Sequence, residues 1–283
     1  MQNPITIHDI TDLYVIVDDH FLKKTGGVGR PSALTDSEMI TIPVWCTALL
    51  RSKTIKDIYE FIRIYHCNDF SSLPDYSSFV RHCNRLNPIL AKFLQGSLQT
   101  DSKIQFVDST MLPVCRDVRA NSHKVAKEVA AFGKNHQGWH YGFKLHATVN
   151  ENGQLCSFCF TPANIHDAQT LPFLIRGRLK RIIVGDGGYN ASVMRKRIYK
   201  ENNSFVLAYP HPKQKKKLIN YWQKILLRAR PKVECVFDYL KNHLCLVTSF
   251  PRSVNGYFFN YLRNLPAYQF KEPERSLKII IDP

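Results

Sequence analysis

The sequence predicts an α/β protein in which an N-terminal region made only of helices precedes a mixed β-sheet. Segments within residues 1–100 have helix-like apolar spacing and begin after capping or turn residues. From residue 101, β-branched and apolar runs alternate with turn residues, which is typical of strands. Three such strands follow one another before helices and strands begin to alternate. This order indicates antiparallel pairing first and parallel crossovers afterwards.

The N-terminal helices are predicted within residues 32–50, 54–66 and 74–98. The capping or turn residues that precede them are Ser32, Thr54 and Asp75. Three short helices separated by tight turns suit a helix-turn-helix-like module that binds DNA, and we expect it to span residues 1–100. The third helix carries Arg81 and Arg85, which can face a DNA groove or form a solvated helix surface.

The second region has predicted strands at residues 104–114, 139–149, 154–164, 181–186 and 204–210. Its helices are expected at residues 167–178, 191–202, 218–244 and 253–265. Pro231 would mark a break or a first helical turn within the third of these helices. The order of strands and helices matches that of ribonuclease-H-like folds. We expect this domain to span residues 101–270 and a tail to follow at residues 271–283.

The charge of the chain points to a polyanionic partner. Lys and Arg outnumber Asp and Glu by 39 to 23, which gives a net charge of +16. Nucleic acid fits this excess better than a membrane surface. The apolar run MITIPVWCTALL is too short to span a bilayer, and the N-terminal segment MQNPITIHDITDLY lacks the apolar core of a signal peptide. We therefore expect a cytoplasmic protein that binds nucleic acid and no membrane.

The eight cysteines do not predict a metal site. Cys156 and Cys159 have metal-ligand spacing, but no second pair completes a zinc set. Buried free thiols in a reducing cytoplasm explain the cysteines better.

Two acids stand at unusual places in predicted strands. Asp186 ends a buried strand in IIVGDGGYN, where the flanking glycines would let a ligand approach the carboxylate closely. A turn followed by a helix N-cap would explain the same residues without a ligand. Asp108 lies inside the apolar strand IQFVDSTML, where a carboxylate is costly unless it is paired or binds a cation. Ser109 and Thr110 could instead supply hydrogen bonds.

A third acid lies on the predicted helix in RARPKVECVFDYLK. Glu234 shares one helix face with Arg230, Asp238 and Lys241, opposite an apolar stripe. This face could also be a surface ladder of ion pairs, and Asp238 is a rival acid one turn later.

Together the three acids indicate one kind of site. Carboxylates brought close would raise each other's pKa, and divalent cations would remove that cost. Oxygen ligands suit Mg²⁺ or Mn²⁺, and two such ions about 3.5–4 Å apart can hold the attacking and leaving oxygens of a phosphodiester. The sequence therefore predicts phosphoryl transfer on DNA at Asp108, Asp186 and Glu234.

Between Gln105 and Tyr268 the sequence resembles a DDE transposase of bacterial insertion sequences, and most of all the insertion sequence nine-eight-two family. The similar segments are FVDST, VCRDVRANSHKVAK, GWHYGFKLH, TPANIHDAQT, GDGGY and RARPKVECVFDYLK. The resemblance implies a ribonuclease-H-like catalytic core with Asp108, Asp186 and Glu234 as the metal-binding triad.

Two positions depart from the pattern of related transposases. Their signature Tyr-x2-Arg-x3-Glu-x6-Lys is matched by Arg230, Glu234 and Lys241, but Leu227 stands in place of the Tyr. Gly187 stands where a Lys usually follows the second acid.

Several basic residues are candidates for DNA contact. Strand alternation places Lys144 and His146 on one polar face of residues 139–149, which suits phosphate binding or an exposed sheet surface. Residues 213–232 carry eight bases and no acids around Tyr221 and Trp222, a pattern that suits phosphate neutralisation and base stacking. Lys241 and Arg230 would stabilise the charge that develops on the scissile phosphate.

These residues predict a nucleoid-associated transposase that binds the terminal repeats of its element and joins the element's ends to target double-stranded DNA. Because two ends must be held together, we expect a homodimer or a larger synaptic complex. Two alternatives remain open: a ribonuclease-H-like nuclease without strand transfer, and an inactive, DNA-binding transposase remnant.

Overall fold

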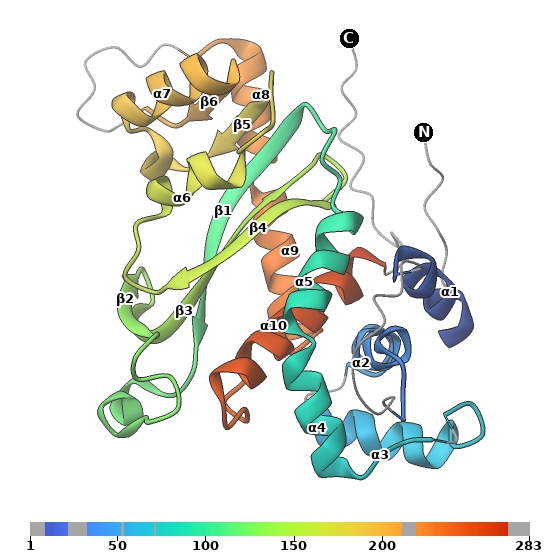
Figure 1. Cartoon of the computed structure of the whole chain (residues 1–283). Helices are drawn as coiled ribbons and strands as arrows, with labels where there is room; N and C mark the ends of the chain where they lie inside the picture. The colour runs from blue at the N-terminus through green and yellow to red at the C-terminus, as the bar shows by residue number, and fades with distance from the viewer. Residues whose placement is uncertain (1–8, 22–32, 52–53, 71, 211–218, 271–283) are drawn as a thin grey trace. The chain divides into compact units, whose positions relative to one another are not determined.

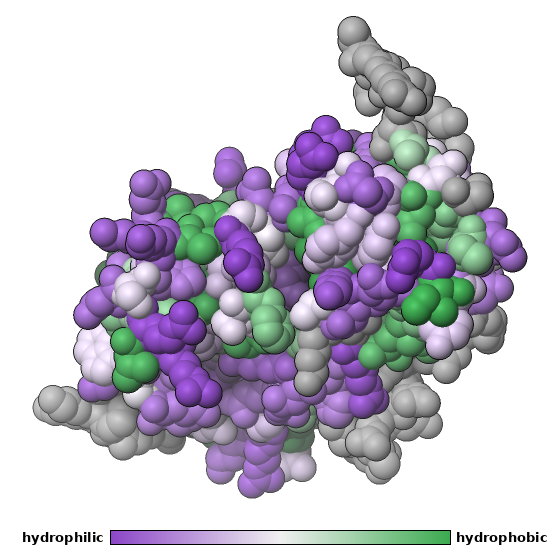
Figure 2. Space-filling view, turned by 90° about the horizontal axis from the view of Figure 1, so that it is seen from below, coloured by the Kyte–Doolittle hydropathy of each residue, from purple (hydrophilic) through white to green (hydrophobic). Residues whose placement is uncertain are grey.

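The computed structural model describes residues 9–21, 33–51, 54–70, 72–210 and 219–270 (Figure 1). The chain folds into two compact units. The first contains the described residues up to Ser97 together with those from Leu240 onward, and the second contains Leu98–Tyr239. Hydrophilic side chains dominate the face of the molecule seen in Figure 2, where hydrophobic ones lie in small separate groups.

The first unit is entirely helical in its described part. Its helices are α1 (Ile10–Phe21), α2 (Asp36–Leu50), α3 (Ile55–Tyr65), α4 (Tyr76–Arg85), α5 (Asn87–Ser97) and α10 (Val254–Gln269). Thr54 and Asp75 are N-caps of α3 and α4, as predicted, because their side chains accept backbone N–H groups of the first turn. Helix α2 begins later than expected, after a capping box made by Thr35 and Glu38. The expected cap Ser32 lies outside the described residues.

Two features of this unit differ from the expectation of three helices. Helix α1 was missed, although its buried residues Ile10, Leu13 and Val17 have helical spacing. The predicted helix at residues 74–98 is two helices separated at Leu86. Pro88 has no N–H to continue the hydrogen bonds of α4 and instead lies in the first turn of α5.

Helix α10 packs with the N-terminal helices. Its side chains Arg263 and Gln269 donate hydrogen bonds to Thr47 on α2 and to the carbonyl of Ser97 on α5. The compact sheet-containing unit therefore ends at Tyr239, which differs from the expected boundary at residue 270. The expected tail at residues 271–283 lies outside the described residues.

The second unit contains a six-stranded mixed sheet, which confirms the predicted α/β class. Its strands are β1 (Ile104–Pro113), β2 (Ala131–Asn135), β3 (Gly138–Val149), β4 (Leu155–Pro162), β5 (Ile182–Gly185) and β6 (Phe205–Ala208). The spatial order is β2-β3-β1-β5-β6, and β4 pairs with the part of β3 that β2 leaves free. Strands β1–β4 pair antiparallel, whereas β1, β5 and β6 run parallel.

Short helices complete this unit. They are η1 (Asp117–Ser122), α6 (Asp167–Leu174), η2 (Gly187–Tyr189), α7 (Ser192–Asn202), α8 (Tyr221–Ala229) and α9 (Pro231–Asn242), of which α9 crosses the boundary between the units. Pro231 is the first residue of α9, so it marks a helical first turn. Strand β2 was not predicted, because its sequence AFGKN is short and has Gly at its centre. Among the described residues, no helix is long and apolar enough to cross a membrane.

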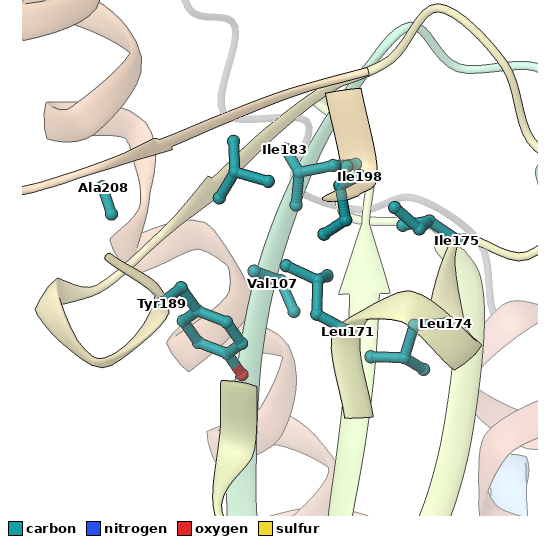
Figure 3. Close-up of a cluster of buried hydrophobic side chains, with 9 residues drawn as sticks. Val107, Leu171, Leu174, Ile175, Ile183, Tyr189, Ile198 and Ala208 are labelled. Carbon is teal, nitrogen blue, oxygen red and sulfur yellow. The ribbon is translucent and has the colours of Figure 1, made fainter. Parts of the chain in front are cut away.

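A hydrophobic cluster anchors the strand that carries Asp186. Side chains from β1, α6, β5, η2, α7 and β6 meet there: Val107, Leu171, Leu174, Ile175, Ile183, Tyr189, Ile198, Val206 and Ala208 (Figure 3). Tyr189 follows Asp186 by three residues and is fully buried. The turn at the end of β5 is thus fixed to the core by a large aromatic side chain.

Gly185 is required for this packing. A Cβ at Gly185 would lie 2.7 Å from the ring of Tyr189 and 3.0 Å from Val107, whereas a Cβ at Gly187 would have nothing within 4 Å. We expect Gly185→Ala to lower the free energy of unfolding by roughly 1–3 kcal/mol through overpacking. Gly187→Ala is the matched control and should change it by less than about 0.5 kcal/mol. Urea unfolding measures both, and equal effects would contradict the packing argument.

Candidate active site

Asp108 and Asp186 lie at the same level on neighbouring strands. Strands β1 and β5 pair in parallel, with Phe106 opposite Val184. Asp108 and Asp186 each follow their member of this pair by two residues, so the register continued along both strands sets them side by side. Asp108 is in the middle of β1, and Asp186 stands directly after β5. The parallel pairing therefore gives the two acids corresponding positions on neighbouring segments of the sheet.

Arg230 joins Asp108 to the third acid. Its Nη2 atom lies 3.0 Å from Oδ2 of Asp108, and its Nη1 atom lies 2.7 Å from Oε1 of Glu234. Arg230 is the C-terminal cap of α8, directly before α9, and Glu234 follows one turn later. The side chains of Asp108 and Arg230 are 16% and 19% exposed, whereas that of Glu234 is 51% exposed. One guanidinium thus bridges a mostly buried acid and a half-exposed acid.

The electrostatics of Asp108 reflect this crowding. Burial raises the pKa of Asp108 to about 6, while the charge of Arg230 and the N–H of Ser109 oppose that rise. The negative charges of Asp186 and Glu234 also raise this pKa. The carboxylate of Asp108 is therefore affected by both other predicted acids, although burial is the larger cause of its raised pKa.

The flanking glycines were expected to leave room for a ligand beside Asp186, and the structure shows such room at only one of them. Its carboxylate accepts the N–H of Gly188 at 2.9 Å and caps η2, which is the turn that sequence reasoning kept as an alternative. The space at Gly185 is filled by Tyr189, while Gly187 faces open space. Of the three glycines, Gly187 is the one beside which a ligand has room.

Helix α9 turns Glu234 toward this site through its apolar stripe. The stripe residues Val233, Val236, Phe237 and Leu240 are buried, as predicted, and leave Glu234 and Asp238 exposed. Arg230 connects Glu234 to Asp108. This ion pair favours Glu234 over Asp238 as the third acid of the site.

Lys144 and His146 do not form an exposed polar face. Strand β3 lies between β1 and the strands β2 and β4, and α6 packs on it, so Lys144 is 8% exposed and His146 is fully buried. The Nζ atom of Lys144 donates to Oδ1 of Asp167 and to the carbonyl of Ile165, both at 2.9 Å. The structure gives the predicted DNA contact of Lys144 and His146 no support, because both side chains have partners inside the fold.

Asp167 is the first residue of α6 but does not cap this helix. The N-cap of α6 is His166, whose ring nitrogen accepts the N–H of Ala168. The Asp167 carboxylate instead pairs with Lys144 and lies 3.7 Å from Nδ1 of His146. This buried network was missed, although the polar alternation of Lys144 and His146 in an otherwise apolar strand was a sequence signal for it.

His146 gives the protein a predictable pH dependence. Burial lowers the pKa of His146 from 6.5 to about 4, opposed by the charge of Asp167 and assisted by that of Lys144. The unfolded chain therefore takes up a proton below pH 6.5 that the folded protein does not bind until about pH 4. We expect the free energy of unfolding to fall between these values by up to about 1.4 kcal/mol per pH unit.

Urea unfolding at pH 7 and pH 5 measures this loss for the wild type and for His146→Gln. The wild type should lose about 2 kcal/mol more than the variant over this interval. Identical pH dependence of the two proteins would show that His146 is not the buried neutral group.

The remaining predicted contacts lie on other surfaces. Arg81 and Arg85 are exposed on α4, and Nη2 of Arg81 donates to Ser78 at 3.0 Å. Lys241 is half-buried near the end of α9. Tyr221 and Trp222 are 74% and 53% exposed at the start of α8, whereas part of the basic run before them, residues 211–218, lies outside the described residues.

The donor set suits hard divalent cations, because the three acids offer carboxylate oxygens. In the part of the chain that the structure describes, no group of three His, Cys, Asp or Glu side chains is arranged closely enough to hold a metal ion. Arg230 instead neutralises two of the acids. Asp108 and Glu234 are therefore held together by a protein cation.

Comparisons with known proteins concern the family and the fold of the chain. A family model described as "Transposase DDE domain" matches residues 98–254, more than half of the chain. No curated protein matches. One similar solved structure is a cryo-EM structure of a piggyBac transposase synaptic complex with hairpin DNA. The TM-score is 0.52 at 10% identity, over 94% of this chain and 72% of that chain, so the likeness concerns the fold alone.

Proposed function

The chain belongs to the transposase DDE domain family, and from this premise we propose that it cuts DNA at the ends of a mobile element and joins them to target DNA. We further propose a ribonuclease-H-like catalytic core and membership of the insertion sequence nine-eight-two family. The observation that supports the proposal is that Arg230 pairs with both Asp108 and Glu234, while Asp186 follows the strand that runs parallel beside Asp108. An ion pair with a purely structural role would need only Arg230 and one acid, whereas here Asp186 also raises the pKa of Asp108.

Asp108, Asp186 and Glu234 would hold two Mg²⁺ or Mn²⁺ ions. When bound, such ions lower the pKa of water and stabilise the charge of the phosphate oxygens. The raised pKa of Asp108 and its need for a cationic partner support this assignment. The core around Tyr189 keeps the Asp186 turn in place, so the carboxylates start from a defined arrangement.

The reaction would proceed in two displacements. Water attacks the phosphodiester at the element end, and the freed 3′-hydroxyl then attacks a phosphodiester of the target in line. Arg230, and Lys241 farther along α9, would stabilise the negative charge that develops on the phosphate. In the first step water forms a bond to phosphorus and the 3′-oxygen of the element leaves as a hydroxyl. In the second step this hydroxyl forms a new phosphodiester and the 3′-oxygen of the target leaves, so no covalent intermediate with the enzyme is needed.

The chain's departures from the signature of related transposases have different consequences. Leu227, at the Tyr position, is 2% exposed and packs within the protein, so it offers no polar group to DNA. Gly187, at the Lys position, faces open space, and a Lys there would meet no obstacle near the backbone. We propose that the chain makes the missing contacts with other bases, such as Lys224 and Arg228, which are exposed on α8 beside Tyr221 and Trp222.

DNA recognition would involve the helical unit. Arg81 and Arg85 on α4 are exposed and would contact the terminal repeats. Because two element ends react together, the active form would be a homodimer or a larger synaptic complex of double-stranded DNA and protein. The protein would work on the nucleoid in the bacterial cytoplasm.

The test is cleavage and strand transfer with the purified chain. A labelled duplex carrying the repeats that flank its own gene is incubated with Mg²⁺ or with EDTA, and a supercoiled plasmid serves as target. We expect Mg²⁺-dependent nicks at the repeat ends followed by joined products. Nicks without joining would identify a nuclease of the same fold, and DNA binding without nicks would identify an inactive remnant.

A further inference from the structure

An aromatic ladder runs across the β2–β3 hairpin. Strand register places Phe132 opposite Tyr141 and Lys134 opposite Trp139 on one face of the hairpin. Ring centroids are 5.0 Å apart between Phe132 and Tyr141 and 6.5 Å apart between Phe132 and Trp139. The Nζ atom of Lys134 lies 5.6 Å from the centre of the Trp139 ring. We call Phe132, Lys134, Trp139 and Tyr141 the aromatic ladder.

The outer part of the ladder is open to solvent. Tyr141 is 7% exposed, but Phe132 and Trp139 are 42% and 55% exposed. Strand β2 is at one end of the sheet (Figure 1). Exposed aromatic side chains at the edge of a sheet favour aggregation. We therefore expect the exposed rings here to bind a partner.

The hairpin under the ladder is held firmly. A Cβ at Gly133 would lie 2.2 Å from the carbonyl oxygen of Ala163, so β2 packs closely against the backbone after β4. The turn is fixed by Asn135, whose Oδ1 accepts the N–H of Gln137 at 2.8 Å and a ring N–H of His140 at 3.1 Å. Gly138 completes the turn with a φ of +122°. The rings thus lose little freedom when a ligand stacks on them.

The chain segment between β1 and β3, which contains β2, carries an excess of exposed positive charge. Between β1 and β3 the exposed cations are Arg116, Arg119, Lys124, Lys127 and Lys134, and the exposed acids are Asp117 and Glu128. Aromatic rings beside cations suit nucleic acid, in which bases stack and phosphates need neutralisation. Ring faces can receive only bases that are unpaired or at an end, because bases within a duplex already stack on each other.

We infer that the aromatic ladder binds a DNA strand by stacking an unpaired base on Trp139 or Phe132, with Lys134 near the adjoining phosphate. The inference rests on the proposed function and adds the substrate form, single-stranded or opened DNA. Along β3, Trp139 is eight residues from Ala147, the partner of Asp108. This separation is roughly 26 Å at the rise of a strand. This length corresponds to about eight nucleotides of a B-form strand and to fewer nucleotides of an extended single strand.

The test measures binding by the full chain in EDTA, so it does not depend on cleavage. Fluorescence anisotropy compares a labelled 20-nucleotide oligo(dT) with a labelled 20-base-pair duplex. We expect Trp139→Ala and Phe132→Ala to weaken binding of the single strand by roughly tenfold and binding of the duplex by much less. Tyr199→Ala is the control, because Tyr199 is 62% exposed on α7 of the same unit.

A second measurement does not require truncation. The chain has three tryptophans, so replacing Trp45 and Trp222 by Phe leaves Trp139 as the reporter. Oligo(dT) should quench its fluorescence with the affinity that anisotropy gives for this same variant, and the duplex should not. The inference would be overturned if oligo(dT) did not quench the fluorescence. It would also be overturned if Trp139→Ala weakened binding of the single strand and of the duplex equally.

The possible failures are distinguishable. If the chain does not nick DNA but Trp139 still selects single strands, the proposed reaction fails and the aromatic ladder remains a DNA site. If nicking occurs and Trp139→Ala changes only the sedimentation coefficient, the surface is a protein interface and the inference is overturned.

Discussion

Glu234→Gln is expected to reduce Mg²⁺-dependent nicking at the repeat ends on the order of a thousandfold. The substitution keeps the shape of the side chain and removes one carboxylate from the proposed metal ligands. It also breaks the ion pair with Arg230, whose guanidinium lies 2.7 Å from Glu234. Because Glu234 is half-exposed, the loss of stability should be small, less than about 1 kcal/mol. Single-turnover nicking and thermal unfolding measure the two effects separately.

Asp238→Asn provides the matched control. Asp238 is an exposed acid one turn farther along the same helix. Its nicking rate should stay within a few-fold of wild type. If Asp238→Asn were inactive and Glu234→Gln active, the third acid of the site would be Asp238.

Arg230→Gln is expected to strengthen metal binding while weakening the metal-free protein. The guanidinium of Arg230 occupies carboxylate oxygens of Asp108 and Glu234 that divalent cations would use. Removing it leaves acids that repel, which we expect to lower the metal-free free energy of unfolding by roughly 2 kcal/mol. Since Mn²⁺ would no longer compete with an internal cation, its dissociation constant should fall by roughly tenfold.

Isothermal titration calorimetry with Mn²⁺ and thermal unfolding with and without Mn²⁺ test this expectation without DNA. The rise in Tm on adding Mn²⁺ should be larger for Arg230→Gln than for wild type. Arg228→Gln, an exposed change two residues earlier, should behave as wild type in both measurements. Weaker Mn²⁺ binding by Arg230→Gln would mean that Arg230 holds the ligands in place. No Mn²⁺ binding by either protein would remove the metals from the proposed function.

The burial of charged groups was least accessible from sequence. Alternation along β3 correctly placed Lys144 and His146 on one face, but alternation does not say whether a helix covers that face. Helix α6 packs there and brings Asp167 to Lys144. Trp139 lies at the start of the same strand and is 55% exposed. Exposure therefore differs along β3 in a way that alternation does not predict.

The sequence by itself determined the α/β class and the helical character of the N-terminal region, and it singled out Asp108, Asp186 and Glu234 as candidate acids. These depend on periodicity, on composition and on carboxylates at places where an isolated charge is costly. Only the tertiary structure decided that Asp108 and Asp186 are level, that Arg230 bridges Asp108 and Glu234, and that α10 packs with the N-terminal helices. The physical reason is that each of these contacts depends on strand register or on helix packing between segments far apart in the chain, which local patterns do not specify.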